Sequence, residues 1–434
     1  MALIFSSETN QFELLNSTVH KVSDARKVFP AILVASLLPS YLLAQPAATD
    51  FPTYRLARTV ALSAPSKTWF LSHLTTARPV FLSRDNQLLQ EASRGDFEPM
   101  RLASTGEPLS VTVSRAGGYF AILGMQSQEQ DNKILLITVY NARGERLYQL
   151  SWQRHFDTPY PLLSVSDRDG SLVVGHADMG RLMFYDKAGT LVKKHDLFPG
   201  AEYGLERVMA MDRSLDGDLV VGAGKRGASP LGLSARQPSA EPAVIFYTST
   251  GTERLRKELS ETNAAALAVS DDGEFVSVAA YTAGVRGNVK KRTVLLRNTG
   301  QEITTLDLLP KQMQFSADSR FLLLAEKQQV ALIATASGKM LWTRQIGSDE
   351  GMIAAVTLAS DAMVAALLLA RNEFRRDHFV FTHGRLKLFD FNGNITQNIM
   401  LNPEAVVMPA AVLAPDGTNL SIGFETSYQT YTRE

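Results

Sequence analysis

The stretch from Ala265 to Pro310 decides the fold class, and it reads AALAVSDDGEFVSVAAYTAGVRGNVKKRTVLLRNTGQEITTLDLLP. An apolar run ends in the turn signal Ser-Asp-Asp-Gly, and a run rich in strand-forming residues, Glu274–Tyr281, follows it. A polar loop containing Gly separates this run from Arg292–Asn298, and Thr-Gly then separates Arg292–Asn298 from Glu302–Leu308. Strands bounded by turn residues at this spacing predict an antiparallel meander of four strands.

The same pattern recurs along most of the chain, and this recurrence predicts a repeat architecture. Units of about 45 residues, each supplying a four-stranded sheet, are typical of the blades of a β-propeller. The inner strands are uninterrupted apolar runs, as expected when each blade buries both faces against its neighbours. The seven units run over Leu109–Trp152, Leu162–Leu197, Arg207–Leu259, Ala265–Pro310, Met313–Ile346, Ile353–Leu401 and Val406–Glu434.

The last of these units supplies only three strands. The segment Arg78–Ala92, RPVFLSRDNQLLQEA, contains a strand candidate that belongs to no repeat. We expect it to pair beside the last unit, because a closed ring leaves no open sheet edge. The predicted fold is therefore all-β: a seven-bladed β-propeller over residues 78–434, with blades of four antiparallel strands and a ring closed by an N-terminal strand.

The first 44 residues carry the pattern of a leader. Three basic residues between positions 21 and 27 precede the uncharged run Phe29–Ala44, FPAILVASLLPSYLLA. A basic flank, a short apolar run and a small residue before Gln45 predict a secretory signal peptide cleaved after Ala44. We therefore expect a periplasmic or secreted protein, with residues 45–77 as an arm or linker. The alternatives are an uncleaved anchor and a cytoplasmic propeller whose leader is misassigned.

The turns carry a resemblance to known propellers. The inner turns Ser270–Gly273, Ser316–Ser319 and Ala414–Gly417, and the outer turn Ser337–Trp342 with its Gly-Lys-x-x-Trp element, resemble those of the PQQ-like and WD40-like propeller superfamilies. The resemblance covers residues 78–434 and implies the fold. It implies no cofactor, because only Trp152 and Trp342 match the repeated tryptophan, the PQQ and calcium-ligand pattern is missing, and the WD40 Gly-His and Trp-Asp dipeptides do not recur.

Composition and motifs argue against several functional classes. The chain has 44 basic and 44 acidic side chains, so it lacks the basic field expected of a nucleic-acid-binding protein. It has no cysteine, which excludes disulfides, cysteine-ligated metals and a catalytic thiol. Neither HExxH nor G-x-S-x-G occurs, and the aspartates at the inner turns are explained by turn geometry. We therefore predict no catalytic, cofactor-binding or metal-binding residue, and no transmembrane span after the leader.

The most informative feature for function is the position of three insertions, at Gly224–Pro242, Thr282–Lys291 and Arg371–Arg385. Each connects the second and third strands of its unit, so all three lie on one face, where loops on a rigid scaffold commonly bind partners. They are rich in basic residues. The predicted partner-binding residues are Lys225, Arg226, Arg286, Lys290, Lys291, Arg371, Arg375, Arg376 and Arg385.

A basic face of this kind suits an acidic protein, an anionic glycan or lipid headgroups. We expect another protein as the partner and therefore predict a non-catalytic binding or assembly scaffold. The alternative is a small-ligand-binding or enzymatic propeller that uses the same face or the central channel. An enzyme would need titratable residues that converge in a pocket, whereas a scaffold needs a broad surface.

Overall fold

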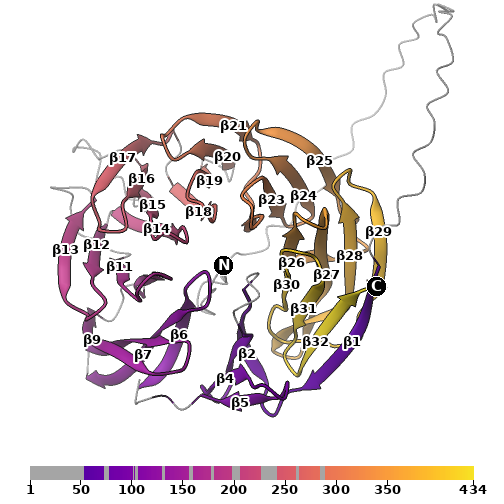
Figure 1. The fold of residues 1–434 in the computed structure, drawn as a ribbon, viewed down its shortest axis with the longest axis horizontal. Helices are drawn as coiled ribbons and strands as arrows, with labels where there is room; N and C mark the ends of the chain where they lie inside the picture. The colour runs from indigo at the N-terminus through magenta and orange to yellow at the C-terminus, as the bar shows by residue number, and fades with distance from the viewer. Residues whose placement is uncertain are drawn as a thin grey trace, which may run out of the picture. The chain divides into compact units, whose positions relative to one another are not determined.

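The computed structural model of the protein describes residues 53–72, 78–100, 102, 106–129, 132–155, 160–176, 180–197, 206–225, 242–260, 263–283 and 289–434. Over these residues the chain forms a ring of eight four-stranded antiparallel sheets and contains no helix (Figure 1). The chain is therefore an all-β propeller, but the predicted count of seven blades is wrong. We number the blades 1 to 8 along the chain.

Blades 1 to 4 come from the first part of the chain, and each is a meander of consecutive strands. Blade 1 contains β2 (Ser66–Phe70), β3 (Val80–Ser83), β4 (Leu88–Glu91) and β5 (Phe97–Pro99). Blade 2 contains β6 (Glu107–Val113), β7 (Tyr119–Glu129), β8 (Asn132–Asn141) and β9 (Arg146–His155). Blade 3 contains β10 (Leu162–Val165), β11 (Leu172–His176), β12 (Arg181–Tyr185) and β13 (Leu191–Asp196). Blade 4 contains β14 (Glu206–Arg213), β15 (Leu219–Lys225), β16 (Ala243–Tyr247) and β17 (Glu253–Glu258).

Blades 5 to 8 complete the ring, and only the last combines strands from both ends of the chain. Blade 5 contains β18 (Asn263–Val269), β19 (Phe275–Ala283), β20 (Val289–Arg297) and β21 (Glu302–Leu306). Blade 6 contains β22 (Gln312–Phe315), β23 (Phe321–Glu326), β24 (Gln329–Ala334) and β25 (Lys339–Gln345). Blade 7 contains β26 (Met352–Ala359), β27 (Val364–Arg375), β28 (His378–Asp390) and β29 (Ile395–Met400). Blade 8 contains β30 (Ala410–Leu413), β31 (Asn419–Gly423), β32 (Ser427–Arg433) and, as its outer strand, β1 (Tyr54–Ala61).

The extra blade explains the wrong count. Residues 78–92, predicted to close the ring, instead form β3 and β4 in the middle of blade 1. The closing strand is β1, which lies in the segment expected to be a linker and pairs antiparallel with β32. Blade 1 was missed because its strands are short and its β3–β4 turn has no glycine. Asn86 takes the left-handed conformation there, with φ of 60°.

An apolar cluster fills each of the eight interfaces between neighbouring blades. The interface between blades 8 and 1 is aromatic, with the rings of Trp69 and Tyr428 stacked at 5.5 Å. The Trp69 Nε1–H also donates a 2.9 Å hydrogen bond to the carbonyl of Phe424. Each fully buried large apolar side chain contributes roughly 2 kcal/mol, so the clusters account for the uninterrupted apolar inner strands.

Strand β1 also ties blade 8 to blade 7. The hydroxyl of Tyr54 donates a 2.7 Å hydrogen bond to the carbonyl of Gly417, within blade 8. The side-chain amide of Gln397, on β29, accepts from the Tyr54 N–H and donates to its carbonyl, both at 2.8 Å. The N-terminal strand therefore closes the ring through contacts to two blades.

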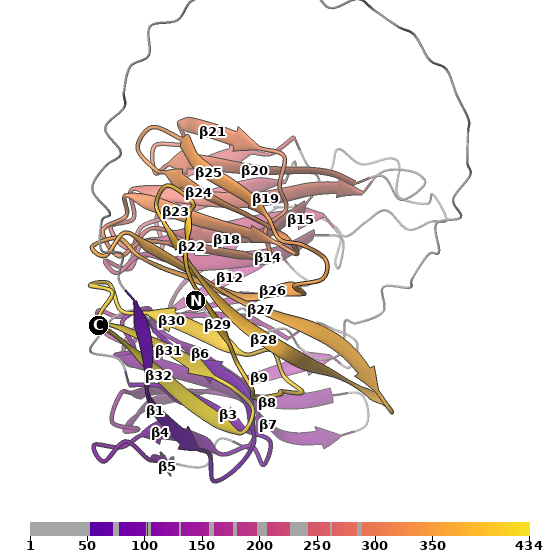
Figure 2. The same cartoon turned by 90° about the vertical axis from the view of Figure 1, so that its right-hand side faces the viewer.

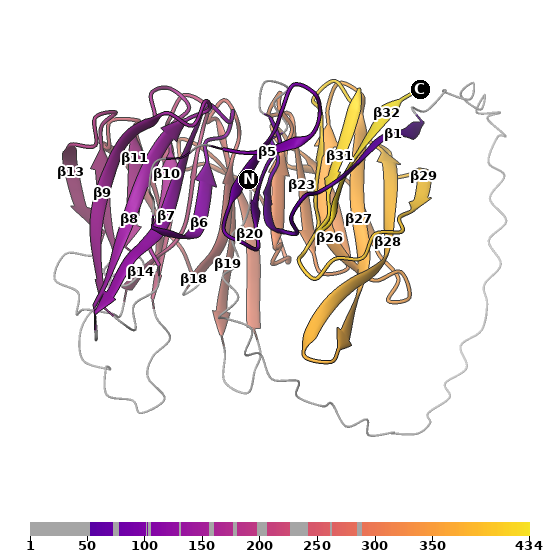
Figure 3. The ribbon, with the colours of Figure 1, turned by 90° about the horizontal axis from the view of Figure 1, so that it is seen from below.

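Strand alternation gives the ring two distinct faces. The turn face carries the connections between the first and second strands, and between the third and fourth strands, of each blade. The loop face carries the connections between the second and third strands and those that lead from blade to blade. Figures 2 and 3 show the hairpin of β27 and β28 extending past the neighbouring strands on the loop face.

Candidate functional site

The far end of the β27–β28 hairpin, Arg371–Thr382, is the most prominent described element of the loop face, and we call it the arm. Strand β26 pairs with β27 only as far as Ala370, so the arm extends beyond the four-stranded blade. Here the pairing shifts register: Leu369 faces Arg385, whereas Arg371 faces Thr382. The shift is a β-bulge, and bulges bend a strand and redirect its side chains. The loop predicted at 371–385 is thus a continuous, bent hairpin.

One face of the arm is aromatic and exposed. Phe374 and Phe379 pair directly across the two strands, and their rings meet edge to face at 4.9 Å. Phe374 is 63% exposed and Phe379 49% exposed. Two adjacent exposed phenylalanines contribute little to the core. Their position is the kind of apolar anchor that protein interfaces use.

The other face of the arm packs against the connection from β29 to β30. The Arg375 guanidinium clamps both carboxylate oxygens of Glu404, at 2.9 and 3.2 Å. The backbones of Phe381 and Ala405 exchange two hydrogen bonds, at 2.7 and 3.1 Å. These contacts hold the arm in place at its base and near its tip, so it presents its aromatic face from a fixed position.

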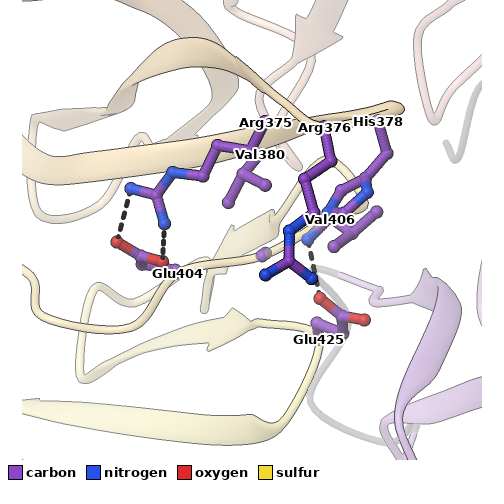
Figure 4. A pocket seen from close by; sticks show the side chains of 8 residues that line it. Arg375, Arg376, His378, Val380, Glu404, Val406 and Glu425 are labelled. Carbon is purple, nitrogen blue, oxygen red and sulfur yellow. Dashed lines mark hydrogen bonds and ion pairs between the residues drawn. The ribbon is translucent and has the colours of Figure 1, made fainter.

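A pocket of about 410 Å³ lies between the arm and blade 8 (Figure 4). Its apolar floor is formed by Val380, Ala405 and Val406, and its charged lining by Arg375, Arg376, His378, Glu404 and Glu425. Figure 4 shows the Arg376 guanidinium directed into this space, above Glu425.

Both carboxylates of the pocket already have partners. Glu404 is clamped by Arg375. Glu425 is buried, accepts a 2.6 Å hydrogen bond from the Val406 N–H on one oxygen and pairs with Arg84 at 2.5 Å through the other. Among the residues that the structure describes, Arg376 has no such partner. The pocket therefore has one uncompensated cation.

The pKa shifts on the arm reflect the same network. Glu373 accepts a 2.8 Å hydrogen bond from the Thr382 hydroxyl and pairs with Arg375 at 3.0 Å. The Thr382 hydroxyl and then Arg375 lower the pKa of the Glu373 carboxyl. The carboxylates of Glu404 and Glu373 raise the pKa of Arg375. Arg375 therefore serves as a brace of the arm, and its charge is already neutralised.

The predicted basic residues that the structure describes do not form one patch of free charge. Arg375 and Arg376 meet at the pocket, and Arg371 donates to the carbonyl of Asp349. Arg385 is half-buried on β28, beyond the bulge. Lys291 pairs with Glu326 at 3.0 Å, and Lys290 is exposed beside it on β20, two blades away. Arg226, Arg286 and the side chain of Lys225 lie outside the described residues.

The structure adds a second polar site, at the centre of the ring on the turn face. Arg115, in the first turn of blade 2, reaches Asp212 of blade 4 and Asp271 of blade 5, both at 2.7 Å. It also donates to the carbonyl of Val269 at 2.7 Å. Blades 2 and 5 are not neighbours, so this cluster spans the ring near its axis.

The cluster is shielded from water, and its charges support one another. The Arg115 side chain is 15% exposed and that of Asp271 is 7% exposed. Burial by itself would lower the pKa of Arg115, but Asp212 and Asp271 more than offset this and raise its pKa. Arg115 was not among the site residues predicted from the sequence. The available signal was an arginine after the turn serine, where two other inner turns carry Asp167 and Asp271.

The aspartates of the inner turns organise the backbone. Asp272, Asp318 and Asp416 each accept a hydrogen bond from the backbone N–H two residues later, at 2.9, 3.1 and 2.9 Å. No group of three or more potential metal ligands occurs within the described residues. No helix in the same part of the chain is long and apolar enough to cross a membrane.

Comparison with known proteins supports the fold. The C-terminal WD40 domain of Sif2, a crystal structure, superposes with a TM-score of 0.56, covering 88% of this chain and 99% of that domain. The chain has a WD40-like β-propeller fold. The sequence identity is only 10%, so the likeness concerns the fold alone. In all, 1149 chains of solved structures match, a number too large to single out one activity.

Sequence comparison gives no closer assignment. No family model matches the chain, and no curated protein matches it either. The two tryptophans that resembled the PQQ-like motif are buried. Trp342 stacks on Phe389 of the next blade at 5.6 Å, and Trp152 contacts His176 of the next blade at 4.7 Å.

Proposed function

We propose that this WD40-like propeller is a non-catalytic scaffold that binds another protein through its loop face, with the arm as the principal contact. The observation that carries the proposal is the exposed Phe374–Phe379 pair on a braced hairpin. Neither phenyl ring takes part in closing the propeller. The arm is fixed by contacts to Glu404 and Ala405 before any partner binds. A preorganised aromatic anchor loses little conformational freedom on binding.

The basic residues have a secondary role in this proposal. Arg371, Arg375 and Lys291 are occupied by contacts within the chain, so they brace the loop face. Arg376 adds positive charge that attracts an acidic partner during the encounter. The aromatic pair then supplies the buried core of the interface, and the charges act at its rim.

The test is crosslinking in intact cells followed by affinity capture. The variant Phe374→Ser/Phe379→Ser removes the aromatic face. We expect it to lose a discrete protein that the unchanged chain captures. The control is Met363→Ser, because Met363 is 56% exposed in the same blade but lies in the turn between β26 and β27, on the turn face.

The control variant should capture the partner as well as the unchanged chain does. Equal capture by all three chains would contradict the proposal and move the binding site away from the arm. Thermal unfolding of each variant should be measured alongside, so that loss of capture is not confused with loss of folding.

We also propose that the protein is exported and acts in the periplasm or outside the cell. The support is the basic flank and apolar run that end at Ala44. The test is N-terminal sequencing of the natural protein. A mature chain that starts at Gln45 is the expected result, and a cytoplasmic chain that retains the leader would contradict the proposal.

A further inference from the structure

The pocket beneath the arm has a charge that nothing in the described structure balances. Its two acidic residues are engaged through both oxygens, Glu404 by Arg375 and Glu425 by Val406 and Arg84. Arg376 points into the same space (Figure 4). A carboxylate that entered would find a guanidinium free to make the bidentate contact that Arg–carboxylate pairs favour.

The backbone at Arg376 also suggests a role for its side chain. Residues 376 and 377 form the two-residue loop of the hairpin, and Arg376 has φ of 58°. Glycine is the usual residue at a left-handed position in such a loop, because any side chain there is strained. Conformational strain of this kind concentrates at functional sites. Here it positions a guanidinium at the mouth of the pocket.

The rest of the lining limits what the carboxylate can be attached to. Val380, Ala405 and Val406 provide an apolar surface beside the cation, and a volume of about 410 Å³ falls within the range of small-ligand sites. The site therefore suits an acidic group flanked by aliphatic groups. It does not suit a polyanion, because the carboxylates of Glu404 and Glu425 line the same space.

We propose that this pocket binds a glutamate or aspartate side chain of the partner polypeptide, flanked by aliphatic residues, with Arg376 as the residue that recognises the carboxylate. This inference rests on the proposed function and names the chemistry of the partner. The aromatic face of the arm anchors the partner, and the pocket, on the other face of the arm, selects an acidic residue of the same partner.

The test uses two labelled peptides that differ in one residue. The first is Gly-Ser-Val-Glu-Val-Ser-Gly, blocked at both ends, and the second carries Gln in place of Glu. Ligand-observed NMR titration with the full chain should give a dissociation constant roughly tenfold lower for the Glu peptide. The preference should weaken as the salt concentration rises.

The variant Arg376→Gly removes the charge and retains a residue that accepts the positive φ. It should bind the Glu peptide roughly tenfold more weakly and lose the preference over the Gln peptide. The matched control is Lys327→Gly. Lys327 is an exposed cation with φ of 40° in the β23–β24 turn of the neighbouring blade, also on the loop face, and outside the pocket. Its replacement should leave binding of both peptides unchanged.

Three results would overturn the inference: equal affinity for the two peptides, equal loss of affinity in the two variants, or no measurable binding. A further titration uses N-acetylglutamate as the ligand. If it binds as tightly as the Glu peptide, the site takes a free carboxylate and the polypeptide assignment is wrong. Failure of the pocket is distinguishable from failure of the proposed function, because capture that depends on Phe374 and Phe379 can persist when no peptide binds.

Discussion

Both faces of the ring carry connections between antiparallel strands, but the connections differ in kind. The turn face has tight turns in which side chains bind backbone and charged groups of the same chain, as at Asp416 and in the cluster around Arg115. The loop face carries the arm, which extends past the blade and exposes Phe374 and Phe379. The first arrangement stabilises the ring, whereas the second places side chains where a partner can reach them.

The left-handed residues sharpen this contrast. On the turn face most of these positions are glycines, among them Gly170, Gly273 and Gly417. On the loop face Lys327, Arg376 and His383 take the same conformation with large polar side chains. A left-handed conformation costs a non-glycine residue roughly 1 to 2 kcal/mol. At these three positions the loop face retains large polar side chains where backbone energy alone favours glycine, although glycines hold other left-handed positions there, such as Gly180 and Gly351.

The largest expected effect on the free energy of unfolding comes from a substitution on the turn face, at Arg115. The change Arg115→Ala leaves the carboxylates of Asp212 and Asp271 largely buried without their cation. We expect the free energy of unfolding to fall by about 3 kcal/mol, because removing one partner of a buried ion pair is strongly destabilising. Denaturant unfolding measures this. The control Arg320→Ala removes an exposed pair with Asp318 and should cost less than about 1 kcal/mol. Equal losses would contradict the turn-face account.

The next effect compares one left-handed residue from each face. A Cβ at Gly417 would lie 2.2 Å from the Cβ of Ala362, and the residue has φ of 68°. We expect Gly417→Ala to cost about 2 kcal/mol of stability. Arg376→Gly should change stability by less than about 0.5 kcal/mol, because relief of backbone strain offsets the added flexibility of the unfolded chain. Thermal unfolding of both variants tests the pair. A large loss in Arg376→Gly would show that Arg376 is structural.

A smaller effect is expected for the aromatic pair. The variant Phe374→Ser/Phe379→Ser should change the free energy of unfolding by less than about 1 kcal/mol, since both rings are exposed. Its effect on partner capture should nevertheless be large. Denaturant unfolding and capture measured on the same preparations separate the two quantities. If the free energy of unfolding fell by several kcal/mol, Phe374 and Phe379 would be needed for folding. That result would contradict the proposed difference between the two faces.

The smallest expected effect is on the loss of stability at acidic pH. Hydrogen bonds from the backbone N–H and the hydroxyl of Thr418 lower the pKa of Asp416. Because its folded-state pKa lies below the unfolded value, ionised Asp416 adds stability that is present above about pH 4 and is lost as the pH falls through the folded value. The variant Asp416→Asn should therefore show a shallower loss of melting temperature below about pH 4. An unchanged acid profile would mean that this turn does not depend on the charge.

Much of the ring could be predicted from turn chemistry, and the parts that failed share physical causes. Seven blades have the expected meander, because pairs such as Asp272-Gly273 mark the ends of their strands. Blade 1 lacks a glycine at its β3–β4 turn, where Asn86 takes the left-handed conformation instead. The cluster at Arg115 depends on contacts across the ring, and local sequence carries little information about such contacts. The sequence predicted that the basic insertions lie on one face. It could not predict which of their charges form ion pairs within the chain, such as Lys291 with Glu326, because composition does not show those contacts.

The central claim is that the loop face, and not the turn face, binds the partner. The most direct measurement places a photo-crosslinking amino acid at Phe379 in one chain and at Met363 in another, then irradiates intact cells. The two positions belong to the same blade and have similar exposure, 49% and 56%, but lie on opposite faces. We predict a discrete crosslinked protein from position 379 and none from position 363. A crosslink from position 363 alone would contradict the claim.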